Sequence, residues 1–225
     1  MIRVDHVVLD YGLGNANSIA SCLRDIGCHV VISNQASQLY HARGIYIPGV
    51  GSFNQAMTKL QEQGLVEVLN NIKKEGDTLI VGMCLGMQLF AQSSDENGCT
   101  EGLGWIPGKV KNLDEHIPKE HRLPHIGWNK LEETSRDALF SLATENDSYY
   151  FDHSFHFETN RKYVCATTRY GAVFTAMVKR DNVVGFQFHP EKSQLAGKRL
   201  LIGLLNSYQI DRQSVWITNE SQLPR

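Results

Sequence analysis

The chain has 225 residues, a formal net charge of −2 and a pI near 6.5. A chain of this length buries about 70% of the surface that its unfolded form exposes, so a hydrophobic core alone can stabilise it. The weak charge argues against nucleic acid or a membrane surface as a partner, and no apolar run reaches the ~20 residues of a membrane span. Five cysteines, an odd number with scattered spacing, favour reduced thiols and a cytoplasmic protein.

The first half of the sequence alternates short apolar strands with amphipathic helices. Ile19, Cys22, Leu23 and Ile26 fall on one face of a helix that Gly27 ends. Strands separated by helices indicate right-handed crossovers and a parallel sheet covered on both faces. The predicted strands are residues 4–9, 29–32, 45–47 and 78–82, and further helices are predicted at 56–60, 65–72 and 85–90.

The second half is dominated by strand-like runs that Gly, Asn, Asp and Pro separate. These runs are residues 105–113, 126–132, 149–157, 164–168, 174–179 and 183–188, and a helix at 197–208 follows them. The predicted fold class is therefore α/β, with a mixed, largely parallel central sheet flanked by helices. We expect one domain over residues 1–210 and a polar C-terminal tail over 211–225.

The strongest local signal for chemistry is residues 82–86, which read Gly-Met-Cys-Leu-Gly between a predicted strand and a predicted helix. A nucleophile at such a strained turn stands clear of the sheet, and the flanking glycines let backbone approach it closely. The helix N-terminus favours a thiolate at Cys84 and directs backbone N–H groups toward a developing oxyanion. A buried core cysteine is the commoner fate of this residue type, but the glycines and the strand–helix context favour a nucleophile.

A thiolate nucleophile needs a base, and residues 185–191 supply a candidate near the end of a strand. His189 and Glu191 are two residues apart, so an extended backbone directs both side chains to one side. Pro190 biases His189 away from helical geometry. An isolated His-Pro-Glu is usually a turn with a solvated carboxylate, but in combination with Cys84 it predicts a Cys-His-Glu triad.

Two further glycine-containing segments follow predicted strands. Residues 48–51 read Pro-Gly-Val-Gly, and free N–H groups there are candidates for completing an oxyanion hole, although the segment alone is typical of a turn. Residues 12–15 resemble a phosphate loop but lack its third glycine, so we interpret them as a helix-opening turn.

The histidines and cysteines do not predict a metal site. Pro124 interrupts the helix that would align His121 with His125, and His153 and His156 are predicted to point to opposite faces of one strand. No pair of cysteines has zinc-ligand spacing. We therefore expect neither a metal ion nor a cofactor.

Taken together, these segments resemble the class I, triad-type glutamine amidotransferases, a family with a flavodoxin-like fold. The resemblance runs from about residue 4 to residue 208. Within the family, the motifs look most like those of the glutaminase subunit of imidazole glycerol phosphate synthase. The segment Pro-His-Ile-Gly-Trp-Asn is what narrows the choice. The matching segments are residues 48–51, 82–88, 124–129 and 185–193.

The resemblance implies a role for each matching residue. It implies that Cys84 attacks the glutamine carboxamide, that His189 transfers the proton and that Glu191 orients His189. It also implies a heterodimer with a barrel-shaped synthase (cyclase) subunit that receives the ammonia. The remaining implied residues are Val50 and Leu85 for the oxyanion hole, Gly51, Gln88, Glu96, Ser154 and Phe155 for glutamine binding, and Asn15, Trp128, Asn129 and Lys192 for the partner interface.

Some segments depart from the family pattern. Residues 152–155 read Asp-His-Ser-Phe, where the family has an apolar residue, His, Ser and Tyr. Residues 53–57 and 102–106 look more like a sister branch that supplies ammonia to a sugar amidotransferase in surface-polysaccharide biosynthesis. The same motifs are also compatible with a stand-alone cysteine hydrolase acting on γ-glutamyl bonds, and the fold with a non-enzymatic binding subunit.

Overall fold

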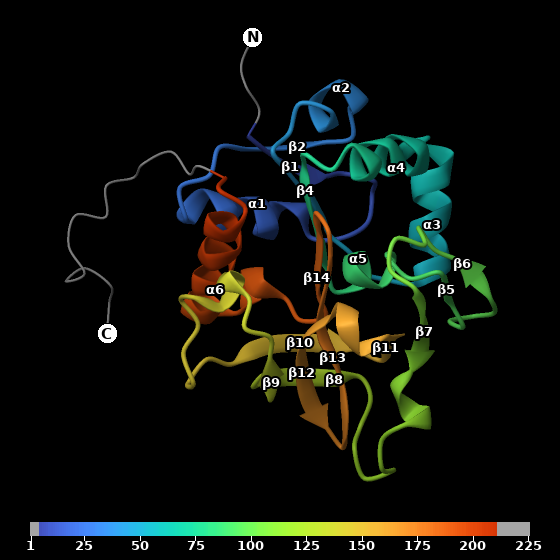
Figure 1. The fold of residues 1–225 in the computed structure, drawn as a ribbon. Helices are drawn as coiled ribbons and strands as arrows, with labels where there is room; N and C mark the ends of the chain where they lie inside the picture. Colours follow the sequence, from blue (N-terminus) through green and yellow to red (C-terminus); the bar gives the residue numbers. More distant parts are fainter. Residues whose placement is uncertain (1–4, 211–225) are drawn as a thin grey trace.

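The computed structural model describes residues 5–210, and its centre is an eight-stranded sheet with the order β2-β1-β3-β4-β14-β13-β12-β9 (Figure 1). The first five strands in this order are mutually parallel, and the other three are antiparallel. The order of the parallel part is that of flavodoxin-like folds. The predicted fold class is therefore confirmed. The strands are β1 (His6–Leu9), β2 (Val30–Ser33), β3 (Gly44–Ile47), β4 (Leu79–Met83), β9 (Glu133–Thr134), β12 (Val164–Tyr170), β13 (Ala172–Arg180) and β14 (Val183–Phe186).

Helices cover both faces of the parallel part of this sheet. Helices α1 and α6 lie on one face, and α3 and α4 lie on the other (Figure 1). The α1 helix begins where the Asn15 side chain accepts a hydrogen bond from the Ser18 backbone N–H. The helices are α1 (Ala16–Asp25), α2 (Ala36–Leu39), α3 (Phe53–Glu62), α4 (Leu65–Glu75), α5 (Leu85–Gln88) and α6 (Gln194–Ser207), with short 3-10 helices η1 (Leu113–Glu115), η2 (Ala138–Phe140), η3 (Arg161–Tyr163) and η4 (Pro190–Lys192).

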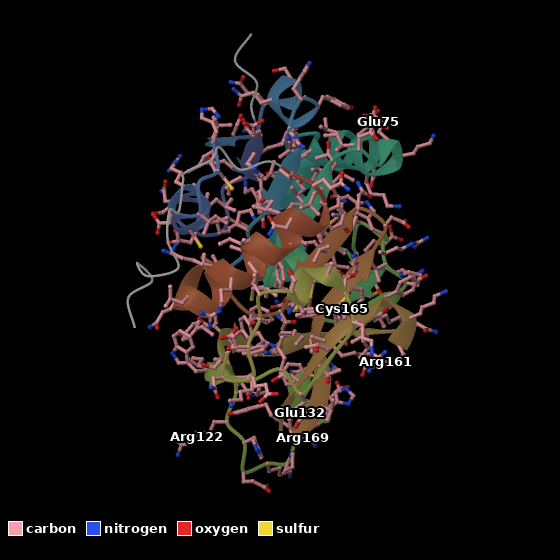
Figure 2. The ribbon with its side chains drawn as sticks, turned by 60° about the vertical axis from the view of Figure 1, so that its left-hand side comes forward. Glu75, Arg122, Glu132, Arg161, Cys165 and Arg169 are labelled. Carbon is pink, nitrogen blue, oxygen red and sulfur yellow. The ribbon has the colours of Figure 1, made fainter. Side chains whose placement is uncertain are left out.

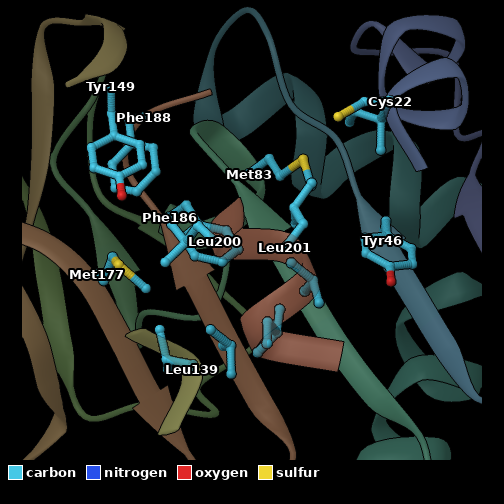
Figure 3. Close-up of a cluster of buried hydrophobic side chains, with 14 of the residues drawn as sticks. Cys22, Tyr46, Met83, Leu139, Tyr149, Met177, Phe186, Phe188, Leu200 and Leu201 are labelled. Carbon is cyan, nitrogen blue, oxygen red and sulfur yellow. The ribbon is translucent and has the colours of Figure 1, made fainter. Parts of the chain in front are cut away.

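Alternating residues of the central strands pack into two separate hydrophobic clusters, one on each face. From β4, Met83 faces the side of α1 and α6, while Ile80 faces the side of α3 and α4. Figure 3 shows the first cluster, in which Phe186 of β14 and Leu200 of α6 lie beside Met83. The sheet is therefore fixed from both faces, which holds the ends of its strands in place.

Two smaller sheets carry the segments between the parallel and antiparallel parts. One pairs β8 (His125–Asn129) with β10 (Tyr149–His153), and the other has the order β11-β7-β5-β6. The members of the second are β5 (Ser93–Ser94), β6 (Thr100–Glu101), β7 (Gly108–Asn112) and β11 (Phe155–Thr159). The prediction of a single strand over residues 149–157 was wrong, because the chain breaks at Ser154 and passes from one small sheet to the other.

Most of the other predicted boundaries differ from the observed ones by a few residues. The predicted strand 105–113 begins only after Pro107, and the predicted helix 85–90 ends at Gln88.

At the end of the antiparallel hairpin, the Arg169 Nε donates to the Glu132 Oε1 at 2.7 Å, and Figure 2 shows these side chains together. No helix within residues 5–210 is long and apolar enough to cross a membrane, and the predicted tail 211–225 lies outside the described residues.

Candidate active site

The carboxyl ends of two neighbouring parallel strands bring Cys84 and His189 together. In the register of β4 and β14, Met83 pairs with Phe186, and the Cys84 N–H donates to the Phe186 carbonyl at 2.7 Å. Beyond β14, the His189 N–H donates to the Tyr150 carbonyl at 2.8 Å, which fixes the loop that carries the imidazole. Residues about a hundred positions apart in sequence thus meet at one edge of the sheet, where open α/β folds bind their ligands.

The turn at Cys84 has the strained geometry that the sequence predicts. Cys84 has φ 52° and ψ −112°, in the left-handed half of backbone space that residues with a Cβ rarely adopt. The turn stays tight because glycines let the backbones touch: a Cβ on Gly49 would lie 2.5 Å from the Gly86 nitrogen, and a Cβ on Gly86 would overlap the Ile47 carbonyl oxygen. The thiol therefore projects from a rigid turn and is 7% exposed.

His189 lies between the thiol and a buried carboxylate. Its Nδ1 is 2.8 Å from the Glu191 Oε1, and both side chains are nearly inaccessible to solvent. Burial disfavours the charged ring, but hydrogen bonds to Cys84 and to Glu191 outweigh it and raise the pKa of His189 to about 10. The Ser193 hydroxyl, which donates to the His189 carbonyl at 2.6 Å, fixes the same turn. A thiol, an imidazole and a carboxylate therefore lie in line, the order of groups that a nucleophile, a base and an orienting group require.

A pocket of about 270 Å³ opens over the thiol. The structure brings into it every residue that the resemblance implies for glutamine binding and for the oxyanion hole, together with Cys84 and His189. Glu191 lies behind His189 and is not part of the lining. The lining residues are Gly49, Val50, Gly51, Cys84, Leu85, Gln88, Glu96, Asp152, His153, Ser154, Phe155 and His189.

Hydrogen bonds fix the polar walls of this pocket. The Gln88 amide donates to the Phe155 carbonyl at 2.9 Å and to the Gln187 Oε1 at 3.2 Å. Glu96 accepts from the Phe53 backbone N–H at 2.8 Å through one carboxylate oxygen. The pocket walls thus come from the loop after β3, from α5, from Glu96 after β5 and from the junction of β10 and β11.

Val50 and Leu85, the two predicted oxyanion donors, occupy different environments. Leu85 is the first residue of α5 and is 3% exposed, whereas the Val50 side chain is 47% exposed. The two glycines that flank Val50 also differ. Gly49 is held by its contact with α5, while Gly51 has φ 98°, and a Cβ there would meet only the end of the Gln55 side chain within 4 Å. The Val50 N–H is part of the peptide that joins Gly49 to Val50, so the space at Gly51 lies on the other side of Val50 from this donor.

The predicted interface residues form a surface close to His189. Trp128 is 48% exposed on β8 and makes an edge contact with Tyr150, and the Lys192 Nζ lies 5.4 Å from the centre of the same Tyr150 ring. The Asn129 amide donates to the Arg169 carbonyl at 2.7 Å. Asn15 belongs to a separate part of this edge, where a Cβ on its neighbour Gly14 would clash with Pro48.

Several residues of the site were not predicted from the sequence. The Asp152 carbonyl accepts from the Cys84 thiol at 3.7 Å, and the Gln187 amide lies 3.9 Å from the same sulfur. The buried His153 Nδ1 lies 2.8 Å from the Phe155 carbonyl, and its Nε2 lies 3.1 Å from the His125 Nδ1. Gln187 could have been predicted from the sequence, because it stands two residues before His189 in the same motif. The contacts of Asp152 and His153 could not, because they depend on the break between β10 and β11.

Comparison with known proteins agrees with this geometry. The family model described as glutamine amidotransferase class-I matches residues 7–203, and the chain belongs to this family. A solved glutamine amidotransferase superposes with a TM-score of 0.68 at 17% identity, covering 91% of this chain and 99% of that one. A structure of PurLQS from Thermotoga maritima gives a TM-score of 0.70 at 18% identity with the same coverage, so both show the shared fold.

Closer relatives in sequence carry a more specific name. A Vibrio vulnificus protein named imidazole glycerol phosphate synthase subunit HisH 2 is 38% identical over 93% of this chain and 97% of its own length. A subunit HisH from Bdellovibrio bacteriovorus is 40% identical over 86% of this chain and 96% of its own, and one from Archaeoglobus fulgidus is 36% identical over 88% and 96%. The resemblance seen in the sequence is thereby confirmed at the level of the family.

Proposed function

We propose that this chain is the glutaminase subunit of a cytoplasmic imidazole glycerol phosphate synthase, in which Cys84, His189 and Glu191 hydrolyse glutamine to glutamate and ammonia. The observation that carries the proposal is the line of contacts from the strained Cys84 turn through His189 to Glu191, beneath a pocket with the size and polarity for one amino acid. The HisH relatives, at 36–40% identity, support this synthase as the one served.

The first half of the reaction forms a thioester. The Cys84 sulfur attacks the carboxamide carbon of glutamine, and the carbonyl oxygen becomes an oxyanion that the N–H groups of Val50 and Leu85 stabilise. When the tetrahedral intermediate collapses, the carbon–nitrogen bond breaks and His189 donates a proton to the departing nitrogen. Ammonia is thus released and the γ-glutamyl group stays on Cys84.

The second half restores the enzyme. His189, now neutral, removes a proton from water, and the resulting hydroxide attacks the thioester carbon. The carbon–sulfur bond then breaks, glutamate leaves and the Cys84 thiolate is regenerated beside a protonated His189. Glu191 accepts a hydrogen bond from the Nδ1 of His189 throughout, which fixes the ring orientation and stabilises its charged form.

The pocket also supports recognition of the amino-acid end of glutamine. The carboxylate of Glu96 complements an ammonium group, and the backbone around Ser154 and Phe155 offers polar groups along β11. Gly51, which has no side chain, leaves room for a ligand beside it. The Gln88 amide fixes the Phe155 carbonyl by donating a hydrogen bond to it.

Ammonia that escapes to water is protonated and loses its nucleophilicity, so a docked partner that excludes water is expected. The surface around Trp128, Asn129 and Lys192 lies close to His189 through Tyr150 and is our proposed contact with a barrel-shaped synthase subunit. We also assign Asn15, on the separate part of this edge, to that contact. Binding there also offers a means of biasing the Val50 peptide toward the orientation that donates to the oxyanion.

The test is synthesis by the complex with either nitrogen source. Cys84→Ala should abolish glutamine-dependent synthesis, because no thioester can form, and should leave synthesis from an added ammonium salt intact. Glutamine-driven turnover within tenfold of the parent, about 1.4 kcal/mol in barrier, would contradict the assignment of Cys84.

The same preparation separates this function from its rivals. Glutamine hydrolysis should be slow for the isolated subunit and at least about tenfold faster with the synthase subunit and its acceptor ligand. Rates that agree within about threefold would favour a stand-alone γ-glutamyl hydrolase. Activation by a sugar amidotransferase instead of the cyclase would assign the chain to the polysaccharide branch.

A further inference from the structure

A second cluster of functional side chains lies outside the glutamine pocket. His116, at the end of η1, faces His156 and Glu158 on β11, and the candidate donor atoms of the three residues all lie within 4.8 Å of one another. The His116 Nε2 is 3.2 Å from the Glu158 Oε1, and the His156 Nε2 is 3.8 Å from the same oxygen. The two imidazole rings meet edge to face, with centroids 5.0 Å apart.

His156 is the unusual member of this cluster. The whole residue is 6% exposed, yet within residues 5–210 neither of its ring nitrogens has a hydrogen-bond partner. Burying a polar group without a partner is costly, so a buried ring of this kind calls for an explanation, and a bound ion is one that satisfies it. Burial also lowers the pKa of His156 to about 4, which leaves the ring neutral at neutral pH and free to donate a lone pair.

The cluster opens into a cavity distinct from the glutamine pocket. This cavity has a volume of about 370 Å³, and His116, His156 and Glu158 lie together on its wall, whereas none of the three lines the pocket over Cys84. The three residues therefore lie beside a space with room for a further, non-protein ligand.

Contrary to the expectation from the sequence, we propose that His116, His156 and Glu158 bind a divalent transition-metal ion, with zinc as the best match. Two imidazoles and one carboxylate are a common zinc donor set, and the fourth position of a tetrahedral site would face the cavity. In such a site the donor atoms lie about 3.3 Å apart, a value that the separations of 3.2 Å and 3.8 Å bracket. The donor nitrogens of His116 and His156 must also come within this distance of each other. That requires movement of His116, whose side chain is 37% exposed and able to rotate.

The position of the site on β11 indicates what the ion does. His156 follows Phe155, whose carbonyl holds both the Gln88 amide and the His153 ring at the wall of the glutamine pocket. A metal bound here would join η1 to β11 and would stabilise that wall from the opposite side. The role is structural, and it does not depend on the reaction proposed for Cys84.

The test is zinc binding by the full chain with its accessible thiols removed. In a Cys84→Ser, Cys99→Ser background, equilibrium dialysis with elemental analysis should find one zinc ion per chain. His116→Ala and Glu158→Gln alter half-exposed side chains, and each should weaken binding by at least about 100-fold, whereas the exposed His41→Ala is the matched control and should bind as the parent does. Zinc at about 100 times its dissociation constant should raise the thermal midpoint of the parent by about 5–10 °C, reversibly with a chelator.

Two results would overturn the proposal. The first is no zinc bound by the parent at about 100 µM free metal, far above the dissociation constant of a three-ligand protein site. The second is equal zinc affinity in the parent and in both the His116→Ala and Glu158→Gln variants, which would place the ion elsewhere in the molecule.

Discussion

The two edges that meet at the glutamine pocket are built in different ways. On the parallel side, glycine-containing turns follow β3 and β4, and close backbone contacts set the position of Cys84. On the opposite side, β8, β10 and β11 present buried rings: His125 stacks on Tyr170 with centroids 4.2 Å apart, and His153 lies beside Phe174. Backbone packing cannot adjust, whereas neutral imidazoles hold their place only while they stay uncharged. The stability of the first edge should therefore be sensitive to added side-chain volume, and the stability of the second should be sensitive to pH.

The largest effect is expected at the parallel edge, in catalysis. His189→Ala should lower glutamine hydrolysis by at least about 10³-fold, about 4 kcal/mol, because both proton transfers lose their carrier. Glu191→Gln should lower the rate of glutamine hydrolysis less, by about 10- to 100-fold, since the amide oxygen can still accept from the His189 Nδ1–H and hold the ring. The turnover number of each variant in the assembled complex gives the comparison. Equal losses from the two substitutions would mean that Glu191 takes a more direct part.

The next effect concerns stability at the same edge. Gly86→Ala introduces a methyl group that overlaps the Ile47 carbonyl oxygen, and neither backbone can move without displacing the sheet. We expect a loss of at least about 3 kcal/mol in the free energy of unfolding, measured by chemical denaturation. Gly76→Ala is the matched control: Gly76 has φ 85°, but an added Cβ would meet nothing within 4 Å, so only backbone strain of about 1 kcal/mol should appear. Similar losses in both variants would show that close packing at Gly86 is not what fixes the turn.

The smallest effect tests the histidine side. Burial lowers the pKa of His153 from 6.5 to about 3, so below pH 6.5 the unfolded chain binds a proton that the folded chain refuses. Stability is therefore fully present above pH 6.5 and falls as the pH drops, by up to about 1.4 kcal/mol per pH unit from this residue. His153→Gln should reduce the slope of unfolding free energy between pH 6.5 and pH 5 by about that amount. The exposed His41→Gln is the control and should keep the parent's slope of unfolding free energy against pH. An unchanged slope in His153→Gln would show that buried His153 is not a source of the pH dependence.

The alternation of strands and helices was readable from the sequence because apolar periodicity follows directly from which face of each element is buried. It predicted α1 and the parallel strands β1 to β4, though not that β14 is parallel to β4, and it placed Cys84 in a turn between β4 and α5. The same local information failed at Ser154. A strand-like pattern continues through residues 149–157, and nothing within it reveals that β10 pairs with β8 while β11 pairs with β7.

The amino-acid sequence alone reveals the chemistry of short segments: a cysteine between glycines, a histidine followed two residues later by a glutamate, and glycines after a strand. Each is local, because it depends on the backbone preferences of a few neighbouring residues. Which distant segments meet becomes clear only in the folded chain. The pairing of β14 with β4 brings His189 to Cys84, and the position of η1 beside β11 brings His116 to His156 although 40 positions separate them. Such contacts arise from strand pairing and from burial of two hydrophobic clusters, which no spacing in the sequence encodes.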